Sequence, residues 1–185
     1  MATVILRPAS TTIQTGWATT NAHIRISDDD TSTGVTQNNV TCSWEGTLDD
    51  LDSSLSGATI NSFTISANAK AGRAGACNAW LNLIHVHDGA FASELEAWTG
   101  TQGTRTTTAR TTQQDGSSAL TYTYINDCSI KIDPNNQGIT LYELYVTVDY
   151  TLPAGYGNDV IGVASANIGK VNGVATADID KVIGV

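Results

Sequence analysis

The chain has 185 residues, a formal net charge of -9 and a sequence pI of about 4.5. Its nine Lys and Arg residues form no cluster, which argues against direct binding to nucleic acid or to an anionic membrane. No apolar run is long enough to span a bilayer, and the N-terminus lacks the basic start and apolar core of a signal peptide. We therefore expect a protein that is made and assembled in a cytoplasm, with one domain over residues 1–153 and an appendage over residues 154–185.

Short stretches of alternating polarity, separated by Gly, Asn and Asp turns, predict an all-β fold. The predicted strands are Ala22–Ile26, Val40–Trp44, Ile60–Lys70, Trp80–His87, Ala119–Ile125, Ser129–Ile132 and Leu141–Leu152. In the last of these, Leu144, Val146 and Val148 alternate with mostly polar neighbours, so one face of the strand is apolar. This pattern predicts an antiparallel β-sandwich or barrel.

Three stretches between the strands have other patterns. The polar, turn-rich stretch Asp28–Asn39 is predicted to be a loop. The stretch Gly100–Ser118 has almost no apolar residues and is either a long exposed loop or an edge ribbon that pairs with a neighbour. Ala90–Trp98 is predicted to form one or two helical turns, because Phe91, Leu95 and Trp98 fall on one side.

Two groups of residues have the chemistry of metal ligands. His85 and His87 fall on the same face of a predicted strand beside Asp88, an arrangement that can bind a transition metal, but no third ligand is identifiable. Asp28–Asp30 can supply oxygen ligands to Ca²⁺, although a turn that caps its own backbone is the commoner explanation. The sequence therefore predicts no metal site.

Cysteines and acidic turns favour structural interpretations. Cys42, Cys77 and Cys128 are odd in number and lack Cys-x-x-Cys spacing, so we expect buried free thiols instead of a zinc site. The cluster Asp49, Asp50 and Asp52 is predicted to be a solvated acidic turn that can complement a basic partner surface.

The sequence contains no motif typical of an enzyme. It has no Gly-x-Ser-x-Gly elbow and no phosphate-binding glycine loop, and no catalytic residue or cofactor is predicted. The glutamates are scattered along the sequence and form no persuasive catalytic carboxylate pair; they are Glu45, Glu94, Glu96 and Glu143. The four tryptophans can form a sugar-stacking platform, but burial in the core or an interface is favoured; they are Trp17, Trp44, Trp80 and Trp98.

Residues 159–185 repeat themselves with a period of 11. Two and a half short repeats cannot bury their own valines and isoleucines, so they need a partner surface. The predicted contact residues of this assembly arm are Val160, Ile161, Val163, Ile168, Val171, Val174, Ile179, Val182 and Val185. We favour extended segments with a turn at each glycine, since Asn172-Gly173 is a strong tight-turn pair; a helical bundle of arms and a disordered tail are the alternatives.

Several of these motifs together resemble virion proteins. Trp17–Ala22 followed by Ser27–Thr31, the strand Gly57–Ala71 and the closing pattern Tyr145–Tyr150 are similar to jelly-roll-like β-sandwich domains of tailed-phage and prophage virion proteins. The repeat Ile168–Ala175 resembles C-terminal tails of phage structural proteins and fibres. The resemblance implies an all-β, antiparallel jelly-roll-like β-sandwich with an extended C-terminal arm.

The resemblance also implies a function. We expect a non-enzymatic structural protein of the virion, a capsid decoration (cement) protein whose arm docks on neighbouring subunits. Its partners would be copies of itself, in a homo-oligomer, and a major capsid or tail protein, without nucleic acid or membrane. The alternative is a tail or head fibre module that binds a surface carbohydrate. The alternative predicts two or more exposed tryptophans or tyrosines in one groove, whereas decoration predicts buried tryptophans.

Overall fold

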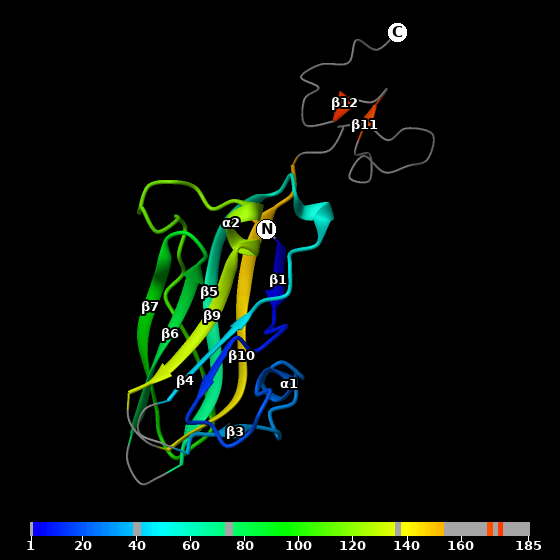
Figure 1. Ribbon diagram of the computed structural model, residues 1–185. Helices are drawn as coiled ribbons and strands as arrows, with labels where there is room; N and C mark the ends of the chain where they lie inside the picture. The colour runs from blue at the N-terminus through cyan, green and yellow to red at the C-terminus, as the bar shows by residue number, and fades with distance from the viewer. Residues whose placement is uncertain are drawn as a thin grey trace.

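The computed structural model describes residues 2–38, 42–72, 76–135, 138–153, 170–171 and 174–175 (Figure 1). Its body is a sandwich of two five-stranded sheets, in which every described pairing is antiparallel. The first sheet has the order β1-β10-β5-β8, with β3 beside β10, and the second has the order β2-β4-β9-β6-β7. The predicted all-β, antiparallel jelly-roll-like β-sandwich is confirmed.

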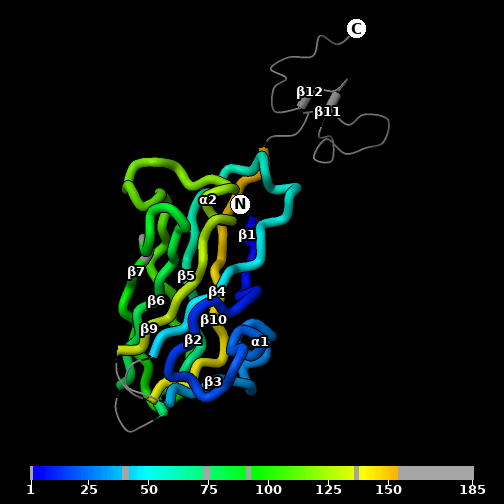
Figure 2. The backbone as a smooth tube through the Cα atoms, in the orientation of Figure 1, coloured from blue at the N-terminus to red at the C-terminus, as the bar shows by residue number. Residues whose placement is uncertain are grey.

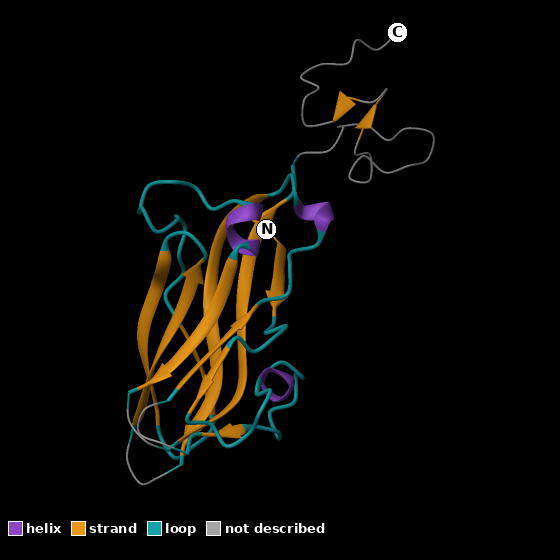
Figure 3. Cartoon of the chain, in the orientation of Figure 1, coloured by secondary structure: helices purple, strands orange, loops and turns teal. Residues whose placement is uncertain are grey.

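The first sheet consists of β1 (Ala2–Leu6), β3 (Val35–Thr36), β5 (Thr59–Ala71), β8 (Gly103–Thr106) and β10 (Ile139–Thr151). The second sheet consists of β2 (Ile13–Thr15), β4 (Ser43–Thr47), β6 (Cys77–His85), β7 (Gly89–Trp98) and β9 (Cys128–Pro134). Three short helices lie at the margins of the sandwich (Figure 3): α1 (His23–Ile26), η1 (Ser53–Leu55) and α2 (Tyr122–Asn126). The arm contributes β11 (Lys170–Val171) and β12 (Val174–Ala175).

The core lies between the inner faces of the two sheets. In the first sheet Val146 is opposite Ile65 and Val148 is opposite Phe63, and all four side chains are buried. The inner face of the second sheet contributes a tryptophan, Trp44, whose indole N–H donates to the Thr11 hydroxyl. Burial of each large side chain contributes roughly 1.5–3 kcal/mol, so the alternation predicted for β5 and β10 supplies much of the driving force.

Two predicted strands are helices. Ala22–Ile26 was predicted to be extended, but α1 buries Ala22 and Ile26, four residues apart, and leaves Ile24 61% exposed. That spacing matches one helical face, and α1 packs beside β10 near β3 (Figure 2). Within the predicted strand Ala119–Ile125, α2 begins after Thr121, whose hydroxyl accepts a hydrogen bond from the Tyr124 amide.

Ala90–Trp98 was predicted to form helical turns, but it is not helical. It forms most of β7, because β6 supplies a full antiparallel partner from Cys77 opposite Trp98 to His85 opposite Gly89. The short strand predicted at Val40–Trp44 is β4, which the structure places at Ser43–Thr47.

The two predicted loops each contain a strand. Gly100–Ser118 includes β8, so the edge-ribbon alternative holds for this stretch, and its partner is β5 of the same chain. Hydrogen bonds between Ser66 and Thr106 and between Asn68 and Thr104 link the two strands on their outer face. Asp28–Asn39 is irregular except for β3, which pairs with β10. Within the described residues, no helix has the length and apolar character needed to cross a membrane.

The close approach of two segments requires glycine at position 46. A Cβ atom at Gly46 would overlap the carbonyl oxygen of Ser10 and lie 2.6 Å from the Trp44 ring. We predict that Gly46→Ala lowers the free energy of unfolding by about 1–3 kcal/mol, as expected for overpacking. Gly57→Ala is the matched control, because a Cβ atom there meets nothing within 4 Å. Urea denaturation of both variants measures the difference; equal stability would contradict the packing argument.

Candidate functional site

The outer face of the second sheet carries side chains in three rows that cross the strands. In the first row Ser129 of β9 lies opposite both Ile84 of β6 and Thr47 of β4. The rows follow from antiparallel pairing, because directly opposed residues point to the same side of a sheet. Successive outward residues of one strand then place the rows about 7 Å apart.

The middle row is polar across three strands. Lys131 of β9 lies opposite Glu45 of β4 and Asn82 of β6. The Lys131 ammonium is 2.8 Å from Asp133 Oδ2, and the Asn82 amide donates to the same carboxylate oxygen at 3.4 Å. Asn82 is buried, so the partly exposed Lys131 ammonium and Asp133 carboxylate are the members of this network that face solvent.

The third row centres on Trp80. Trp80 lies opposite Asp133 on β9 and Leu95 on β7, and it is 40% exposed, as is Leu95 at 41%. The other three tryptophans are buried, in agreement with the favoured prediction; they are Trp17, Trp44 and Trp98. Trp80 departs from that prediction because the strand alternation directs it outward, whereas Leu81 and Leu83 face the core. An accessible indole bordered by polar groups can anchor a ligand.

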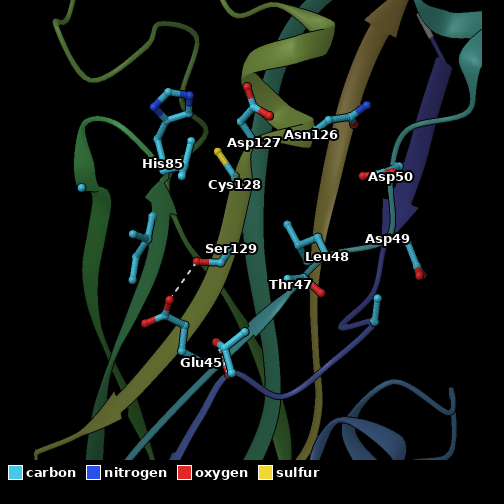
Figure 4. Close-up of a pocket in the computed structure, with 15 residues that line it drawn as sticks. Glu45, Thr47, Leu48, Asp49, Asp50, His85, Asn126, Asp127, Cys128 and Ser129 are labelled. Atoms are coloured by element: carbon cyan, nitrogen blue, oxygen red, sulfur yellow. Dashed lines mark hydrogen bonds between the residues drawn. The ribbon is translucent and has the colours of Figure 1, made fainter.

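An open pocket of about 890 Å³ adjoins the first row (Figure 4). It is lined by the end of β4 and the residues that follow it, the β6–β7 turn, and the junction of α2 with β9. On its floor, the Ser129 hydroxyl donates to Glu45 Oε1 at 3.1 Å, so the pocket and the middle row share the Glu45 side chain. Pocket and rows therefore form one continuous surface, which we call the outer groove.

The pocket end of the outer groove is acidic. Four carboxylates line it, Glu45, Asp49, Asp50 and Asp127, and the lining contains no Lys or Arg. The three aspartates of the predicted solvated acidic turn have two different roles. Asp49 and Asp50 line the pocket, whereas Asp52 caps η1 through the Ser54 amide. Its hydrogen bonds with Ser54 lower the pKa of the Asp52 carboxyl. The resulting field disfavours anionic ligands at this end.

The two histidines do not share a strand face. His85 ends β6 and is buried, with its ring stacked on Tyr124 at 4.0 Å and its Nδ1 3.0 Å from Asp88 Oδ2. His87 lies in the turn after β6, so the two histidines do not share a strand, although their rings meet edge to face with centroids 5.7 Å apart. Among the residues that the structure describes, no group of three or more His, Cys, Asp or Glu side chains is arranged to hold a metal ion.

The Asp28–Asp30 segment caps its own backbone, as the favoured interpretation predicted. Asp28 accepts a hydrogen bond from the Asp30 amide and Asp30 accepts one from the Ser32 amide, at 3.0 and 2.8 Å. Hydrogen bonds with Ser32 lower the pKa of the Asp30 carboxyl. This turn lies outside the outer groove, because Asp29 pairs with Arg7 of the first sheet.

The remaining glutamates are distributed around the sandwich. Glu143 faces outward from the first sheet and pairs with Arg7, and burial raises the pKa of its carboxyl. Glu94 accepts from the Thr108 amide, and burial together with Glu94 raises the pKa of Glu96. Glu45 lies on the opposite sheet from Glu143.

Of the predicted arm residues, the structure describes Val171 and Val174. They lie opposite each other in the antiparallel pair β11–β12, and Asn172 and Gly173 lie outside the described residues. The extended conformation of the arm as a whole, with a turn at each glycine, stays a prediction. The other predicted arm residues lie outside the described residues; they are Val160, Ile161, Val163, Ile168, Ile179, Val182 and Val185.

The sequence contained part of the signal for the outer groove. Trp80 and Ile84 fall on one face of β6, but Leu81 and Leu83 make the other face equally apolar, so alternation does not show which face is outward. The grouping of Glu45, Asn82 and Lys131 depends on strand order, and no local pattern in the sequence reports it.

Comparison with known proteins finds no matching protein-family model and no matching curated protein. Solved structures to which this chain is similar include the C-terminal CBM6 of LamC, a marine laminarinase from Zobellia galactanivorans, at 9% identity and a TM-score of 0.45, covering 80% of this chain and 98% of that one. CBM35 from Paenibacillus barcinonensis has 13% identity and a TM-score of 0.42, covering 82% and 98%. CBM6cm-2 of Cellvibrio mixtus lichenase 5A, in complex with cellotriose, has 12% identity and a TM-score of 0.42, covering 80% and 97%. These likenesses do not indicate which residues of this chain bind a ligand.

The cysteines are buried free thiols, as predicted, and Cys128 lies at the wall of the pocket. Burial raises the pKa of Cys128 to about 12, and its Sγ donates to the Tyr124 carbonyl at 3.1 Å. Burial likewise raises the pKa of Cys42 to about 12.

We predict that Cys42 and Cys128 react slowly with a disulfide reagent at pH 8, because the thiolate is the nucleophile and both folded pKa values lie well above that pH. After unfolding in denaturant, both thiols should react as fast as an exposed cysteine. Mass spectrometry of labelled peptides identifies each site. Fast labelling of Cys128 in the folded protein would show that solvent and reagent reach the thiol through the pocket.

Proposed function

We propose that the outer groove is a carbohydrate-binding surface and that the domain binds its ligand without catalysis. The observation that carries the proposal is the exposed Trp80 indole in mid-strand, with the Asp133 carboxylate in register on β9 and the exposed Leu95 in register on β7. Trp80 is one exposed tryptophan on this surface, where the sequence-based prediction for this function was two or more exposed aromatic residues. A sugar ring has an apolar C–H face and a rim of hydroxyls. It therefore requires an aromatic plane together with oriented donors and acceptors, which is how ligand sites combine apolar contact with a few placed polar groups.

The rows supply donors and acceptors at suitable positions. The partly exposed Lys131 ammonium and Asp133 carboxylate are the donor and the acceptor that face solvent, and the buried Asn82 amide donates to Asp133. These contacts hold the side chains in place before a ligand arrives, which lowers the entropy that binding must overcome. Hydrogen bonds to charged groups are also stronger than neutral ones, by about a factor of two.

The length of the surface indicates an oligosaccharide. Trp80 and Ile84 are four residues apart on β6, a separation of about 13 Å along the strand, and the pocket begins at Ile84. A single sugar ring is shorter than this distance. An oligosaccharide that stacks on Trp80 can therefore extend past Asn82 towards the pocket.

Charge narrows the class of glycan. The pocket end is lined by four carboxylates without a basic side chain, and Lys131 is already paired with Asp133. A uronate or sulfated sugar at this end would face like charges and would lose its hydration without gaining a partner. The proposed ligand is therefore a glycan without acidic groups.

We predict that Trp80→Ala weakens binding of a neutral oligosaccharide by roughly 30-fold, since loss of an anchoring aromatic costs about 2 kcal/mol. The fold should be retained, because the indole is 40% exposed. Leu152→Ala is the matched control, as Leu152 is exposed at the end of β10 on the other sheet. A panel of neutral oligosaccharides identifies the ligand, and calorimetry measures the affinity.

Two results would contradict the proposal. The first is that no neutral oligosaccharide binds the wild-type chain, and the second is that Trp80→Ala binds as tightly as wild type. A glucuronate oligomer of matched length should bind more weakly than its neutral counterpart at low salt, and the difference should shrink as salt screens the pocket.

We also propose an assembly role, in which this chain is a structural component of a virion and its arm docks on neighbouring subunits, as in capsid decoration. The period-11 repeat of apolar residues supports this proposal, as does the antiparallel pair β11–β12, which is extended at Val171 and Val174. Isolated two-stranded pairs of this size are marginal in water, so the arm gains stability from a partner surface. Surface carbohydrate binding and attachment to a particle are compatible roles of one chain.

For the assembly role, we predict that deletion of residues 154–185 leaves a folded sandwich but lowers the molar mass in solution to that of a single chain. The described strands of both sheets end before residue 154, so the deletion removes none of their pairings. Sedimentation velocity gives the molar mass and circular dichroism checks the fold. An assembly of unchanged size with a folded sandwich would reject docking by the arm.

A further inference from the structure

Three aspartates at the pocket end of the outer groove have no partner within the described part of the chain. The carboxylates of Asp49, Asp50 and Asp127 line the pocket, and none of them accepts a hydrogen bond from a described residue or pairs with a described basic side chain. Every other described aspartate does one or the other; these are Asp28, Asp29, Asp30, Asp52, Asp88, Asp115, Asp133 and Asp149. The aspartates that the fold itself does not use are therefore gathered in one pocket.

The carboxylates of the pocket come from different segments. Asp49 and Asp50 follow β4, Asp127 lies between α2 and β9, and Glu45 belongs to β4. In Figure 4 they lie around the pocket, with Asp127 at the top, Asp50 to the right and Glu45 at the bottom. Glu45 accepts from the Ser129 hydroxyl through Oε1, and its Oε2 has no partner among the residues that the structure describes. The pocket therefore offers carboxylate acceptors on several sides of one cavity.

We propose that the outer groove binds a glycan that carries protonated amino groups, with an ammonium group of the sugar chain held by the carboxylates of the pocket. This inference rests on the proposed carbohydrate binding and specifies the chemical class of its ligand. An amino sugar has the same apolar ring face and hydroxyl rim as a neutral sugar, so it can stack on Trp80 in the same way. It differs in presenting a cation where the pocket has unpaired anions.

An ammonium group fits these carboxylates better than a metal ion does. A bound Ca²⁺ takes about six to eight oxygen ligands at fixed short distances. Among the described residues, no group of three or more His, Cys, Asp or Glu side chains is arranged to hold a metal ion. An ammonium group has three donors and requires no closed coordination shell. Separate carboxylates around an open cavity meet that requirement.

No described basic side chain competes for the pocket carboxylates. Lys131, in the middle row, is 2.8 Å from Asp133 Oδ2, and the pocket lining contains no Lys or Arg. The fields of the carboxylates add inside a concave site, which favours a cation there. The three aspartates are exposed, so solvent screens each ion pair, and two such pairs together raise the affinity roughly tenfold at low salt.

The test compares two ligands that differ in one group on each ring. The probes are an oligomer of β-linked glucosamine and the glucose oligomer of the same length and linkage, which has a hydroxyl in place of each amino group. At about pH 5.5, amino groups are protonated and carboxylates of model compounds are ionised. Calorimetry on the full-length chain should give roughly tenfold higher affinity for the glucosamine oligomer at low salt, and this ratio should fall towards one as salt is added.

Paired substitutions locate the ammonium group. Asp50→Asn combined with Asp127→Asn removes two charges from the pocket, keeps the side-chain shapes and should lower the ratio of the two affinities to about two. Asp29→Asn combined with Asp149→Asn is the matched control, because it changes the net charge equally beside the first sheet and asparagine tolerates the positive φ at position 29. The control should keep the wild-type ratio. Trp80→Ala, whose indole is exposed, should weaken binding of both oligomers.

Each result has a defined meaning. A higher affinity for the glucosamine oligomer that the pocket variant removes and the control retains supports the inference. Equal affinities of the wild-type chain for the two oligomers overturn it and leave carbohydrate binding at Trp80 in place. An unchanged ratio in the pocket variant, or a glucosamine affinity that Trp80→Ala does not change, places the amine on another acidic surface and also overturns it.

The remaining outcomes separate this inference from the function on which it rests. Failure of the glucosamine oligomer to bind a chain that binds a neutral oligosaccharide overturns the inference alone. Binding of neither class of oligosaccharide overturns the inference and the carbohydrate-binding function together.

Discussion

The antiparallel register between β6 and β9 determines which chemistry the second sheet presents to solvent. With Leu81 opposite Ile132, the apolar side chains of both strands face the core, and Trp80, Asn82 and Lys131 face outward. A slip of one residue would reverse every side chain of one strand, burying an ammonium group and exposing leucines. The burial of these apolar side chains therefore determines which side chains form the outer groove as well as which form the core; they are Leu81, Leu83, Ile130 and Ile132. The groove is a consequence of packing that takes place on the other side of the sheet.

The two outer faces of the sandwich differ in which side chains remain accessible to a ligand. On the first sheet, Arg7 holds Glu143 and Asp29 and lies 5.5 Å from the centre of the Tyr145 ring, so the charged groups of that face satisfy one another. On the second sheet, the Trp80 indole remains accessible, and the carboxylates at the pocket end have no basic neighbour in the lining. The Trp80 indole and the pocket lie on the second sheet, and the strands of both sheets are complete without the arm. The proposed carbohydrate binding and the proposed docking of the arm are therefore compatible in one chain.

The arm and the edge strand have the same physical basis. An extended segment leaves half of its backbone donors and acceptors without partners, and in a folded protein such groups are almost always paired. The arm repeats carry small and β-branched residues without the length to form a sheet of their own. The outer edge of β1 has no strand partner among the described residues.

The sequence by itself determined the features that depend on local alternation. The strand character of Ile60–Lys70 and Leu141–Leu152, the buried cysteines and the self-capped Asp28–Asp30 turn all follow from the chemistry of neighbouring residues. Where the local preference was weak, tertiary contacts determined the secondary structure. Ala22–Ile26 became a helix because two buried positions four residues apart fit one helical face, and Ala90–Trp98 became a strand because β6 offered a partner. Strand order alone assembled the outer groove, since Glu45, Asn82 and Lys131 come from three segments that meet only when β9 lies between β4 and β6. An alternation of period two predicts that a strand has two different faces. Which of these faces is exposed to solvent depends on the sheet that packs against the strand.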